Sequence, residues 1–398
     1  MNRRKWALPI NIIIFNLSRL IPFRNKRLWI YGAREGDKYD DNSKYMFEYM
    51  NEKYSDEIRS VWFTDNDDTF NLLCDKGYEV YFNSSWKGKL IQMRAGVALY
   101  CHGLMDFGSI PLVGGTELVA LWHGLGFKRI YNGKYSGIKL GLKKFLDRFF
   151  SWTYRTLTPV TSEYAKEWSN RMFTLRYNEI KITGQPRNDA FKSLSRKNIL
   201  NSINISTHKN VIIYMPTYRM ASLGKNAIKN IVVDLYNNKS LDRILTRTNS
   251  VFLVKLHPLT PHIELPVREN FIIFDYAAVE SNHELMGVCD MLVTDYSSCF
   301  VDYALLNRPI IFYTPDEKDF LTNSEKMERD FFTISALNKA VTPEELAGKI
   351  ENPSLDVVKV TNDFFEDQSI KGTCYSENVY RVISNKIGLN KYIGNLRK

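Results

Sequence analysis

The sequence predicts an α/β protein made of two halves, each a parallel sheet wrapped in helices. With 398 residues the chain exceeds the size at which a single hydrophobic core stops growing. Apolar segments of strand length alternate with helical segments in two successive series, which is the pattern of parallel sheets. A polar and basic stretch at residues 190–208 separates the series. We therefore expect two α/β domains, each built on a parallel sheet.

The composition is that of a folded protein with anionic partners. Apolar residues make up 44% of the chain and aromatic residues 13%, which argues against disorder. The net charge of +10 favours phosphates, anionic lipid or nucleic acid. Nucleic acid is not expected, because no aromatic RNA-binding motif, zinc-finger spacing or basic recognition helix is found. The five cysteines form no CxxC pair, which suits a reducing compartment and predicts buried thiols.

Residues 1–26 are predicted to form an amphipathic helix that lies in a membrane interface. The apolar run is too short to span a bilayer and has no small-residue cleavage site. Packing of the helix on the protein's own core is the alternative, and Ile12 and Phe15 spoil the polar face. The apolar stripe comprises Ile10, Ile13, Ile14, Leu17, Leu20 and Ile21, and the flanking basic residues are Arg3, Arg4, Lys5, Arg24, Lys26 and Arg27.

The first half is expected over residues 27–195. Its strands are "RLWIYGA", "IRSVWFTD", "YEVYFN" and "GVALYC", with helices at about 42–53 and 86–94. The second half is expected over 196–375, with strands "NVIIYMPTY", "SVFLVKLHP", "NFIIFDY", "MLVTDYSS" and "PIIFYTP". Residues 376–398 are expected to form a terminal helix, "ENVYRVISNKI", that crosses back to the first half.

Polar residues follow several predicted strands, where open α/β sheets bind their ligands. His123 follows "LW", Arg219 follows "YMPTY", and His257 ends "VKLH". Ser297 and Ser298 stand where a strand gives way to the helix "SCFVDYALL", so they either cap that helix or bind an anion there. These polar residues at the strand ends form the candidate site.

In this order along most of the chain, the motifs resemble those of the CDP-glycerol glycerophosphotransferase family, which primes and polymerises teichoic acids and related surface polymers. The matching stretches are "KYDDNSKYMFEYM", "ALWHGLGFKRI", "VTSEYA", "ITGQPRNDAF", "IIYMPTYR", "VKLHP", "VTDYSSCFVDYALLNRPIIFY" and "FEDQSIKGTCYSENVYRVI". The chain departs from many relatives in "WHGLG", where those carry Thr-Pro after the glycine.

The resemblance implies a GT-B fold, in which two Rossmann-like domains face each other across a cleft, attached peripherally to the cytoplasmic face of the bacterial membrane. It also implies a CDP-polyol donor such as CDP-glycerol or CDP-ribitol, and an acceptor that is polyprenyl-diphosphate-linked or a growing polymer. An acceptor hydroxyl attacks the β-phosphate and CMP leaves. Neither a metal nor another cofactor is expected.

The resemblance and the chemistry together give the candidate site residues. His123 is the expected general base, Gly124 allows close backbone approach, and His257 is the expected acid for the leaving CMP. Fixed positive groups and donors must surround the phosphates. The expected donor-binding residues are Arg219, Lys255, Thr294, Ser297, Ser298, Lys371 and Gly372.

Four further residues are given structural roles. Asp295 and Asp302 are expected to orient strands and cap helices, and Asp189 is expected to be an N-cap. Arg187 is interpreted as a structural clamp, with a cleft residue as the alternative.

Residues 138–152 contain a second amphipathic helix close to His123. Its apolar stripe either binds the membrane or packs in the core. The stripe comprises Ile138, Leu142, Phe145, Leu146 and Phe149, beside Lys139, Lys143, Lys144 and Arg148.

Two other functions stay open. Another GT-B enzyme, either a nucleotide-sugar glycosyltransferase or a UDP-sugar 2-epimerase, would share the fold. A non-enzymatic protein that binds anionic membranes is the other alternative. The sequence does not choose between glycerol and ribitol, between one addition and polymerisation, or among acceptors and oligomeric states.

Overall fold

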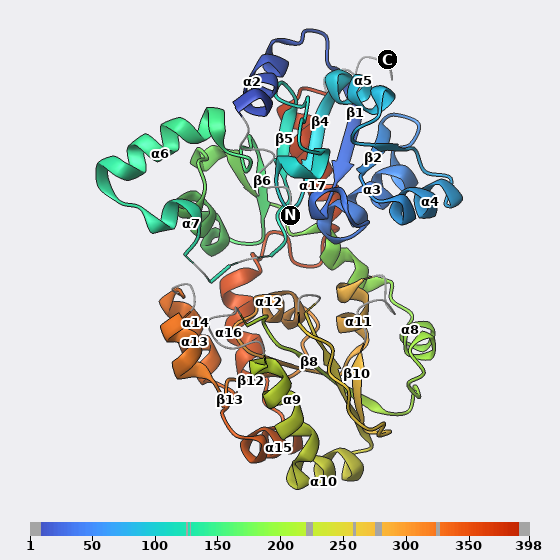
Figure 1. The fold of residues 1–398 in the computed structure, drawn as a ribbon, viewed down its shortest axis with the longest axis vertical. Coiled ribbons are helices and arrows are strands. Elements are labelled where there is room, and N and C mark those ends of the chain that lie inside the picture. Colours follow the sequence, from blue (N-terminus) through green and yellow to red (C-terminus); the bar gives the residue numbers. More distant parts are fainter. Residues whose placement is uncertain are drawn as a thin grey trace. The chain divides into compact units, whose positions relative to one another are not determined.

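The computed structural model describes residues 9–124, 126–127, 129–219, 226–257, 260–274, 281–323 and 327–389 (Figure 1). The chain forms two compact units. Unit 1 contains the residues up to His123, residues 130–189 and those from Asp367 onward, whereas unit 2 contains 124–129 and 190–366. The chain therefore changes unit after Asp189 and after Glu366, earlier than the boundaries predicted at residues 195 and 375.

Unit 1 is built on a parallel sheet with the strand order β3-β2-β1-β4-β5. This order places the first strand in the centre, as in doubly wound α/β folds. A parallel pair, β6 with β7, continues beyond β5 through a bridge between Val119 and Leu157. The strands are β1 (Asn25–Gly32), β2 (Arg59–Thr64), β3 (Val80–Phe82), β4 (Ala95–Tyr100), β5 (Glu117–Ala120), β6 (Thr158–Val160) and β7 (Ile180–Ile182).

Alternate residues of β1 point into two hydrophobic cores, one on each face of this sheet. Trp29 packs on one face with helices α3 (Asp41–Lys53) and α17 (Tyr375–Lys386). Ile30 packs on the other face, where α5 (Trp86–Arg94) and the N-terminal helix α2 (Pro9–Leu17) contribute. The terminal helix α17 thus belongs to unit 1. The remaining α-helices described in this unit are α4 (Asp67–Asp75), α6 (Gly137–Phe150) and α7 (Glu163–Met172).

Unit 2 has a second parallel sheet, with the order β10-β9-β8-β11-β12-β13. Its strands are β8 (Asn210–Met215), β9 (Ser250–Lys255), β10 (Phe271–Phe274), β11 (Met291–Thr294), β12 (Ile310–Tyr313) and β13 (Lys339–Ala340). The described helices are α8 (Arg196–Ser202), α9 (Ala227–Asn237), α10 (Lys239–Arg247), α11 (Asn282–Val288), α12 (Cys299–Ala304), α13 (Glu317–Asn323), α14 (Arg329–Ala336), α15 (Pro343–Glu351) and α16 (Asp356–Phe365).

One core of unit 2 lies between the sheet and helices α9, α10 and α15. An aromatic cluster elsewhere in the unit includes Phe127, whose ring stacks on Phe300 at 5.3 Å and meets Phe331 and Phe365. Phe127 belongs to the short segment 124–129, which directly follows His123 in the sequence. Phe127 is therefore held in unit 2 by its ring contacts.

Helix α2 presents an apolar face to solvent and holds to unit 1 by a different face. Phe15, which the sequence pattern treated as spoiling the polar face, is buried in the core, whereas Ile10, Ile13 and Leu17 are each more than half exposed. Arg24 is not a free surface charge, because its guanidinium donates to the carbonyls of Gln92, Ala95, Ser18 and Leu112. Arg3, Arg4 and Lys5 lie outside the described residues.

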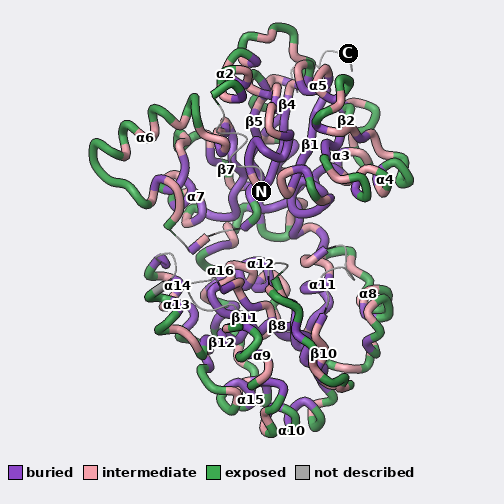
Figure 2. The backbone as a smooth tube through the Cα atoms, viewed as in Figure 1, coloured by how far each residue is buried: buried purple, intermediate pink, exposed green. Residues whose placement is uncertain are grey.

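Helix α6 has no buried residue, so the expectation that it could pack in the core is wrong. Its exposed apolar side chains are Ile138, Leu142, Phe145, Leu146, Phe149 and Phe150. Figure 2 shows α6 as a largely exposed tube. It contacts the N-terminal segment, where Asn16 donates to the carbonyl of Phe149 at 2.9 Å and the Arg19 guanidinium lies over the Phe149 ring.

Within the described residues, no helix combines the length and apolarity needed to cross a bilayer. Cys101 and Cys289 are buried, as predicted, but Cys74 is exposed. All five cysteines are free thiols.

Candidate active site

His123 lies just beyond β5, at the carboxyl edge of the unit 1 sheet. Its Nδ1 is 3.2 Å from the backbone carbonyl of Cys101, which follows the neighbouring strand β4. A carbonyl oxygen only accepts, so Nδ1 carries the hydrogen and Nε2 keeps its lone pair. The preceding residue, Trp122, has φ 61°, and Gly124 has φ 144°. Backbone strain of this kind gathers at functional sites.

The His123 imidazole is neutral at physiological pH. Desolvation lowers the pKa of His123 to about 4, with Arg34 and Arg187 acting in the same direction. Asp41 acts in the opposite direction and favours the imidazolium. The residue keeps exposed surface, so solvent offsets part of the desolvation. A neutral ring with a free Nε2 can accept a proton from a hydroxyl.

A second histidine, His102, stacks on His123. The ring centroids are 4.5 Å apart and the planes differ by only 4°. Trp122 lies 4.3 Å from His123, and the guanidinium of Arg155 lies over the Trp122 ring. The candidate base thus contacts two aromatic rings.

The N-terminus of α3 joins three of the sequence motifs. Asn42 donates to the Trp122 carbonyl at 2.8 Å and accepts from the backbone N–H of Arg187. The Arg187 guanidinium pairs with Asp41 at 2.9 Å, with only 5% and 3% of the two side chains exposed. Burial alone would raise the pKa of Asp41, but Arg187 and Arg34 hold it well below its usual range. Arg187 is therefore a structural clamp, the first of its two predicted interpretations.

Asp189 is a helix cap, as predicted, but for a helix remote in sequence. It accepts from the backbone N–H groups of Tyr375 and Ser376, the first residues of α17, and from the Ser376 hydroxyl. Gly184 adopts φ +79°, and a Cβ there would lie 2.1 Å from the Tyr375 ring. The "GQPRND" stretch thus fixes the returning chain onto unit 1.

Lys371 and Gly372, predicted to contact the donor, also lie in unit 1. Both are exposed, and Gly372 has φ 74°. They follow the turn that begins where Asp367 donates its N–H to Thr161 at 3.0 Å.

In unit 2 the predicted residues follow neighbouring strands of one sheet. Arg219 comes after β8, Lys255 and His257 close β9, and the hydroxyl cluster follows β11. These strands are adjacent in the order β9-β8-β11. The residues therefore share one edge of the sheet, where α/β proteins bind ligands.

The Arg219 guanidinium is already matched by two carboxylates. It lies 2.8 Å from Asp295 and makes a two-pronged contact with Asp316, and only 2% of its side chain is exposed. Burial opposes the charge, but the two carboxylates raise the pKa of Arg219 above its ordinary value. Asp295 also accepts twice from the Thr217 N–H, in line with its predicted structural role. This geometry favours a positioning role for Arg219 over direct contact with phosphate.

The other predicted donor-binding residues differ in how exposed they are and in the hydrogen bonds that they already make. Thr294 is fully buried and donates to the Met215 carbonyl at 2.9 Å. Ser297 accepts from the Cys299 N–H at 3.4 Å, whereas Ser298 makes no capping hydrogen bond with its side chain. Helix α12 has only six residues, so its dipole is a weak anion attractor. Lys255 is buried and His257 is exposed.

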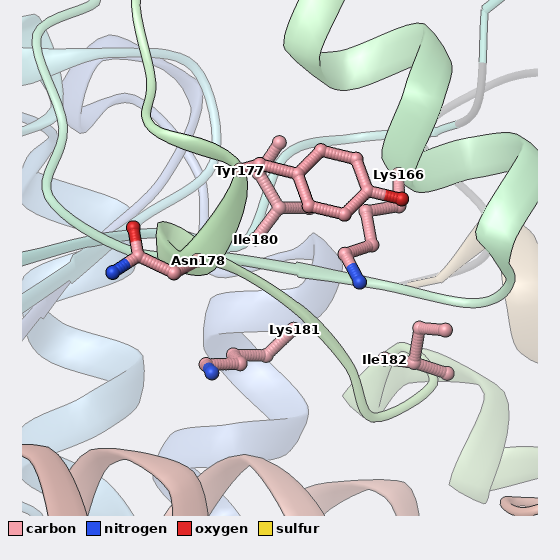
Figure 3. A pocket seen from close by; sticks show the side chains of 6 residues that line it. All are labelled: Lys166, Tyr177, Asn178, Ile180, Lys181 and Ile182. Carbon is pink, nitrogen blue, oxygen red and sulfur yellow. The ribbon is translucent and has the colours of Figure 1, made fainter.

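A shallow groove of about 630 Å³ opens on unit 1 (Figure 3). It is lined by Lys166, Tyr177, Asn178, Ile180, Lys181 and Ile182. Lys166 is paired there with Glu163 at 3.2 Å. None of the predicted site residues lines this groove.

Sequence reasoning missed His102, Asp41 and Asn42. Asp41 and Asn42 stand in the quoted "KYDDNSKY" stretch, so their motif was noted but their position was not. His102 directly follows the predicted strand "GVALYC", at the same kind of strand end as His123. Its position at the carboxyl end of a predicted strand is the signal in the sequence that could have identified it.

The fold and the residues define a class: an α/β protein with two parallel-sheet units and a histidine at the carboxyl end of a strand. The sequence profile of the CDP-glycerol:poly(glycerophosphate) glycerophosphotransferase family matches residues 13–368. The chain belongs to this family. Membership confirms the predicted enzyme class, a CDP-polyol phosphotransferase of teichoic acid synthesis.

Relatives in sequence have related names. A teichoic acid poly(glycerol phosphate) polymerase of Bacillus spizizenii is 28% identical over 95% of both chains. A teichoic acid glycerol-phosphate primase of Bacillus subtilis is 26% identical over 68% of this chain and 69% of its own. A teichoic acid ribitol-phosphate polymerase of Staphylococcus aureus, TarL, is 25% identical over 60% of this chain, which spans 44% of that relative.

Solved structures show the same fold. The wall teichoic acid polymerase TagF has a TM-score of 0.75 at 20% identity, covering 98% of this chain and 95% of that one. A complex of MnaA with UDP from S. aureus has a TM-score of 0.55 at 13% identity, covering 92% and 98%. At these identities the likeness concerns the fold alone.

Proposed function

We propose that this enzyme transfers a polyol phosphate, in the first place glycerol phosphate, from a CDP-polyol to a hydroxyl of a lipid-linked acceptor or growing polymer. The acceptor oxygen forms a bond to the donor's β-phosphorus. The bond between that phosphorus and the bridging oxygen breaks, and CMP leaves with the bridging oxygen. The proton of the acceptor hydroxyl passes to Nε2 of His123.

The geometry of His123 carries this proposal. The Cys101 carbonyl fixes the tautomer that leaves Nε2 able to accept a proton. The neutral state of the ring keeps that lone pair available at physiological pH. Asp41, buried near the ring, favours the imidazolium that forms once the proton is taken.

The donor's diphosphate is proposed to bind at the carboxyl edge of the unit 2 sheet. Lys255, His257, Ser297 and Ser298 would supply charge and hydrogen-bond donors, and His257 would protonate the leaving CMP. Arg219 would act indirectly by holding Asp295 and Asp316 in place. Thr294, whose hydroxyl already bonds within the sheet, would act through the backbone. Lys371 and Gly372 remain proposed donor contacts from unit 1.

The test is turnover by the purified full-length chain with CDP-glycerol and CDP-ribitol supplied separately, together with a soluble acceptor that ends in glycerol phosphate. We expect CMP release and an acceptor heavier by one or more polyol phosphate units. A positioned base contributes about 10²- to 10⁴-fold, so His123→Ala should lower the rate by that range. His208→Ala, an exposed histidine of unit 2, is the matched control and should change nothing.

The same assay separates the alternatives. Turnover of a UDP-sugar with no CMP from either CDP-polyol would favour another GT-B enzyme. Full activity of His123→Ala would remove the proposed base. Because the proposed steps use no metal, a chelator should leave the rate unchanged.

We further propose that unit 1 attaches peripherally to the cytoplasmic face of the bacterial membrane through α2 and α6. Both helices expose apolar side chains, and α6 contacts Asn16 of α2 and Arg19, which lies just after α2. Phe15 and Arg24 tie the N-terminal segment to the core, so this apolar surface is built on a rigid base. Lys139 and Arg148 are exposed on α6, which suits anionic lipid.

A further inference from the structure

Two histidines, not one, occupy the carboxyl edge of the unit 1 sheet at the candidate site. His102 follows β4 and His123 follows β5, and these strands are paired neighbours. The rings lie face to face, with centroids 4.5 Å apart. The nearly parallel planes place the two imidazoles in stacking contact. A substrate oxygen at one ring therefore comes close to the other ring.

The hydrogen bonds give the two rings opposite tautomers. Nδ1 of His102 accepts from the backbone N–H of Arg34 at 3.2 Å. That lone pair is then used, and a neutral His102 must carry its hydrogen on Nε2. In His123 the hydrogen is on Nδ1, because the Cys101 carbonyl can only accept. His102 thus offers an N–H donor beside the lone pair of His123.

The N–H of His102 is in a position that requires a partner. Its Nε2 is inaccessible to solvent and has no hydrogen bond within the part of the chain that the structure describes. A buried donor without a partner costs about 1–3 kcal/mol, so native proteins rarely keep one. Its backbone is held firmly by the N–H bond to Asp106 at 2.9 Å. The donor is fixed in place and unpaired, and an acceptor oxygen reaches it only when the groups that cover it move aside.

We propose that Nε2–H of His102 donates a hydrogen bond to an oxygen of the acceptor, next to the hydroxyl that His123 deprotonates. This inference rests on the proposed function and names the chemistry of its acceptor. The end of a polyol phosphate chain carries hydroxyls on neighbouring carbons. One of them would give its proton to His123, and the neighbouring oxygen would accept from His102. The pair would then decide which hydroxyl of the diol attacks.

Two substitutions separate this role from a structural one. In His102→Gln the side-chain amide places an N–H near the original Nε2 but offers nothing suited to the Arg34 N–H. In His102→Asn the amide oxygen lies near the original Nδ1 and can accept from Arg34, but the distant donor is lost. A purely structural His102 is rescued by Asn, whereas a substrate-binding His102 is rescued by Gln.

The experiment measures the steady-state constants of wild type and both variants, using the glycerol-phosphate-terminated acceptor and an analogue with the neighbouring hydroxyl replaced by hydrogen. We expect His102→Asn to raise the KM for the full acceptor about tenfold, as befits one lost hydrogen bond. The KM for CDP-glycerol should stay unchanged, and His102→Gln should remain within about threefold of wild type. For the deoxy analogue, wild type and His102→Asn should have equal KM values.

Each outcome has a distinct meaning. The inference would be overturned if His102→Asn raised the KM equally for both acceptors, or if Asn in place of Gln kept the KM near that of wild type. Either result would leave the proposed function standing. No CMP release by wild type with either CDP-polyol would overturn the proposed function and this inference together. Thermal unfolding of each variant shows whether it folds. If both variants fail to fold, wild type alone decides, since the deoxy analogue must raise its KM about tenfold.

Discussion

At the scale of single residues, the candidate site is held by buried carboxylates with unusual surroundings. Asp106 accepts from the backbone N–H groups of Glu35, Cys101 and His102 at 2.7–2.9 Å. It thereby fixes the loop that carries both the carbonyl partner of His123 and the second histidine. Desolvation nevertheless raises the pKa of Asp106 to about 7, against those three donors. A carboxyl that anchors the site is therefore predicted to titrate near neutrality.

This titration should appear in the stability of the protein. The folded pKa of Asp106, about 7, lies above the usual unfolded value of about 3.9, so the native state binds the proton more tightly. The contribution of Asp106 to stability is complete below about pH 4 and falls as pH rises to about 7, by at most about 1.4 kcal/mol per pH unit. Urea unfolding of wild type and Asp106→Asn between about pH 4 and pH 7 measures this contribution. The difference in unfolding free energy, wild type minus variant, should decline with pH, and parallel curves would contradict the assignment.

The Asp41–Arg187 pair predicts a large loss of stability. Both side chains are almost fully buried, so removing one leaves an uncompensated charge in the interior. Arg187→Met should lower the unfolding free energy by about 3–5 kcal/mol. Arg59→Met removes the exposed partner of Glu79 and is the matched control, expected to cost about 1 kcal/mol or less. Chemical denaturation of both variants tests the contrast, and equal losses would show that the buried pair does not clamp the site.

At the scale of elements, the strands and main helices could be predicted because their apolar periodicity is strong. The predicted strands from "RLWIYGA" to "PIIFYTP" correspond to β1–β4 and β8–β12, with ends that differ by a few residues. Short strands such as β6, β7 and β13 have only two or three residues, too few for a period to show. The packing of helix α2 was harder to predict, because its apolar stripe faces outward and a single phenylalanine, Phe15, faces the core. Pattern alone does not tell which apolar face a protein buries.

The apolar surface of α2 and α6 gives a prediction for lipid binding. Ile138 is 93% exposed and Phe145 63% exposed, so glutamates there cost little folding free energy. If these side chains enter a membrane, the double variant Ile138→Glu, Phe145→Glu loses two apolar anchors and gains repulsion from anionic lipid. Its partition coefficient onto anionic vesicles should fall at least tenfold, since each side chain contributes about 1.5–3 kcal/mol when buried.

Sedimentation with vesicles measures this partition. The matched control is the double variant Trp86→Glu, Val267→Glu, which changes two exposed apolar side chains outside α2 and α6. We expect that control to bind as wild type does. Equal binding by wild type and the α6 variant would contradict attachment through this surface.

At the scale of the whole molecule, the architecture followed from the sequence more fully than the site did. Two parallel-sheet units were predicted from alternation and length, and the terminal helix was interpreted as one that crosses back to the first half. The motifs located His123 at a strand end, but which residues surround it depends on long-range contacts. Asn42 reaches the Trp122 carbonyl across 80 positions, and no local pattern encodes that pairing. The role of Arg219 could not be predicted for the same reason. Its two carboxylate partners lie far along the chain, and they neutralise the positive charge that was expected to bind phosphate.

The return of the chain to unit 1 bears on how this protein is made. Val379, Tyr380 and Ile383 of α17 lie in the same core as Trp29, although all of unit 2 separates them in the sequence. While a ribosome is still translating unit 2, the first sheet lacks the helix that covers this face. Its apolar surface stays open until α17 has been made, and until then the nascent chain depends on chaperones or on the partly built sheet itself to avoid aggregation.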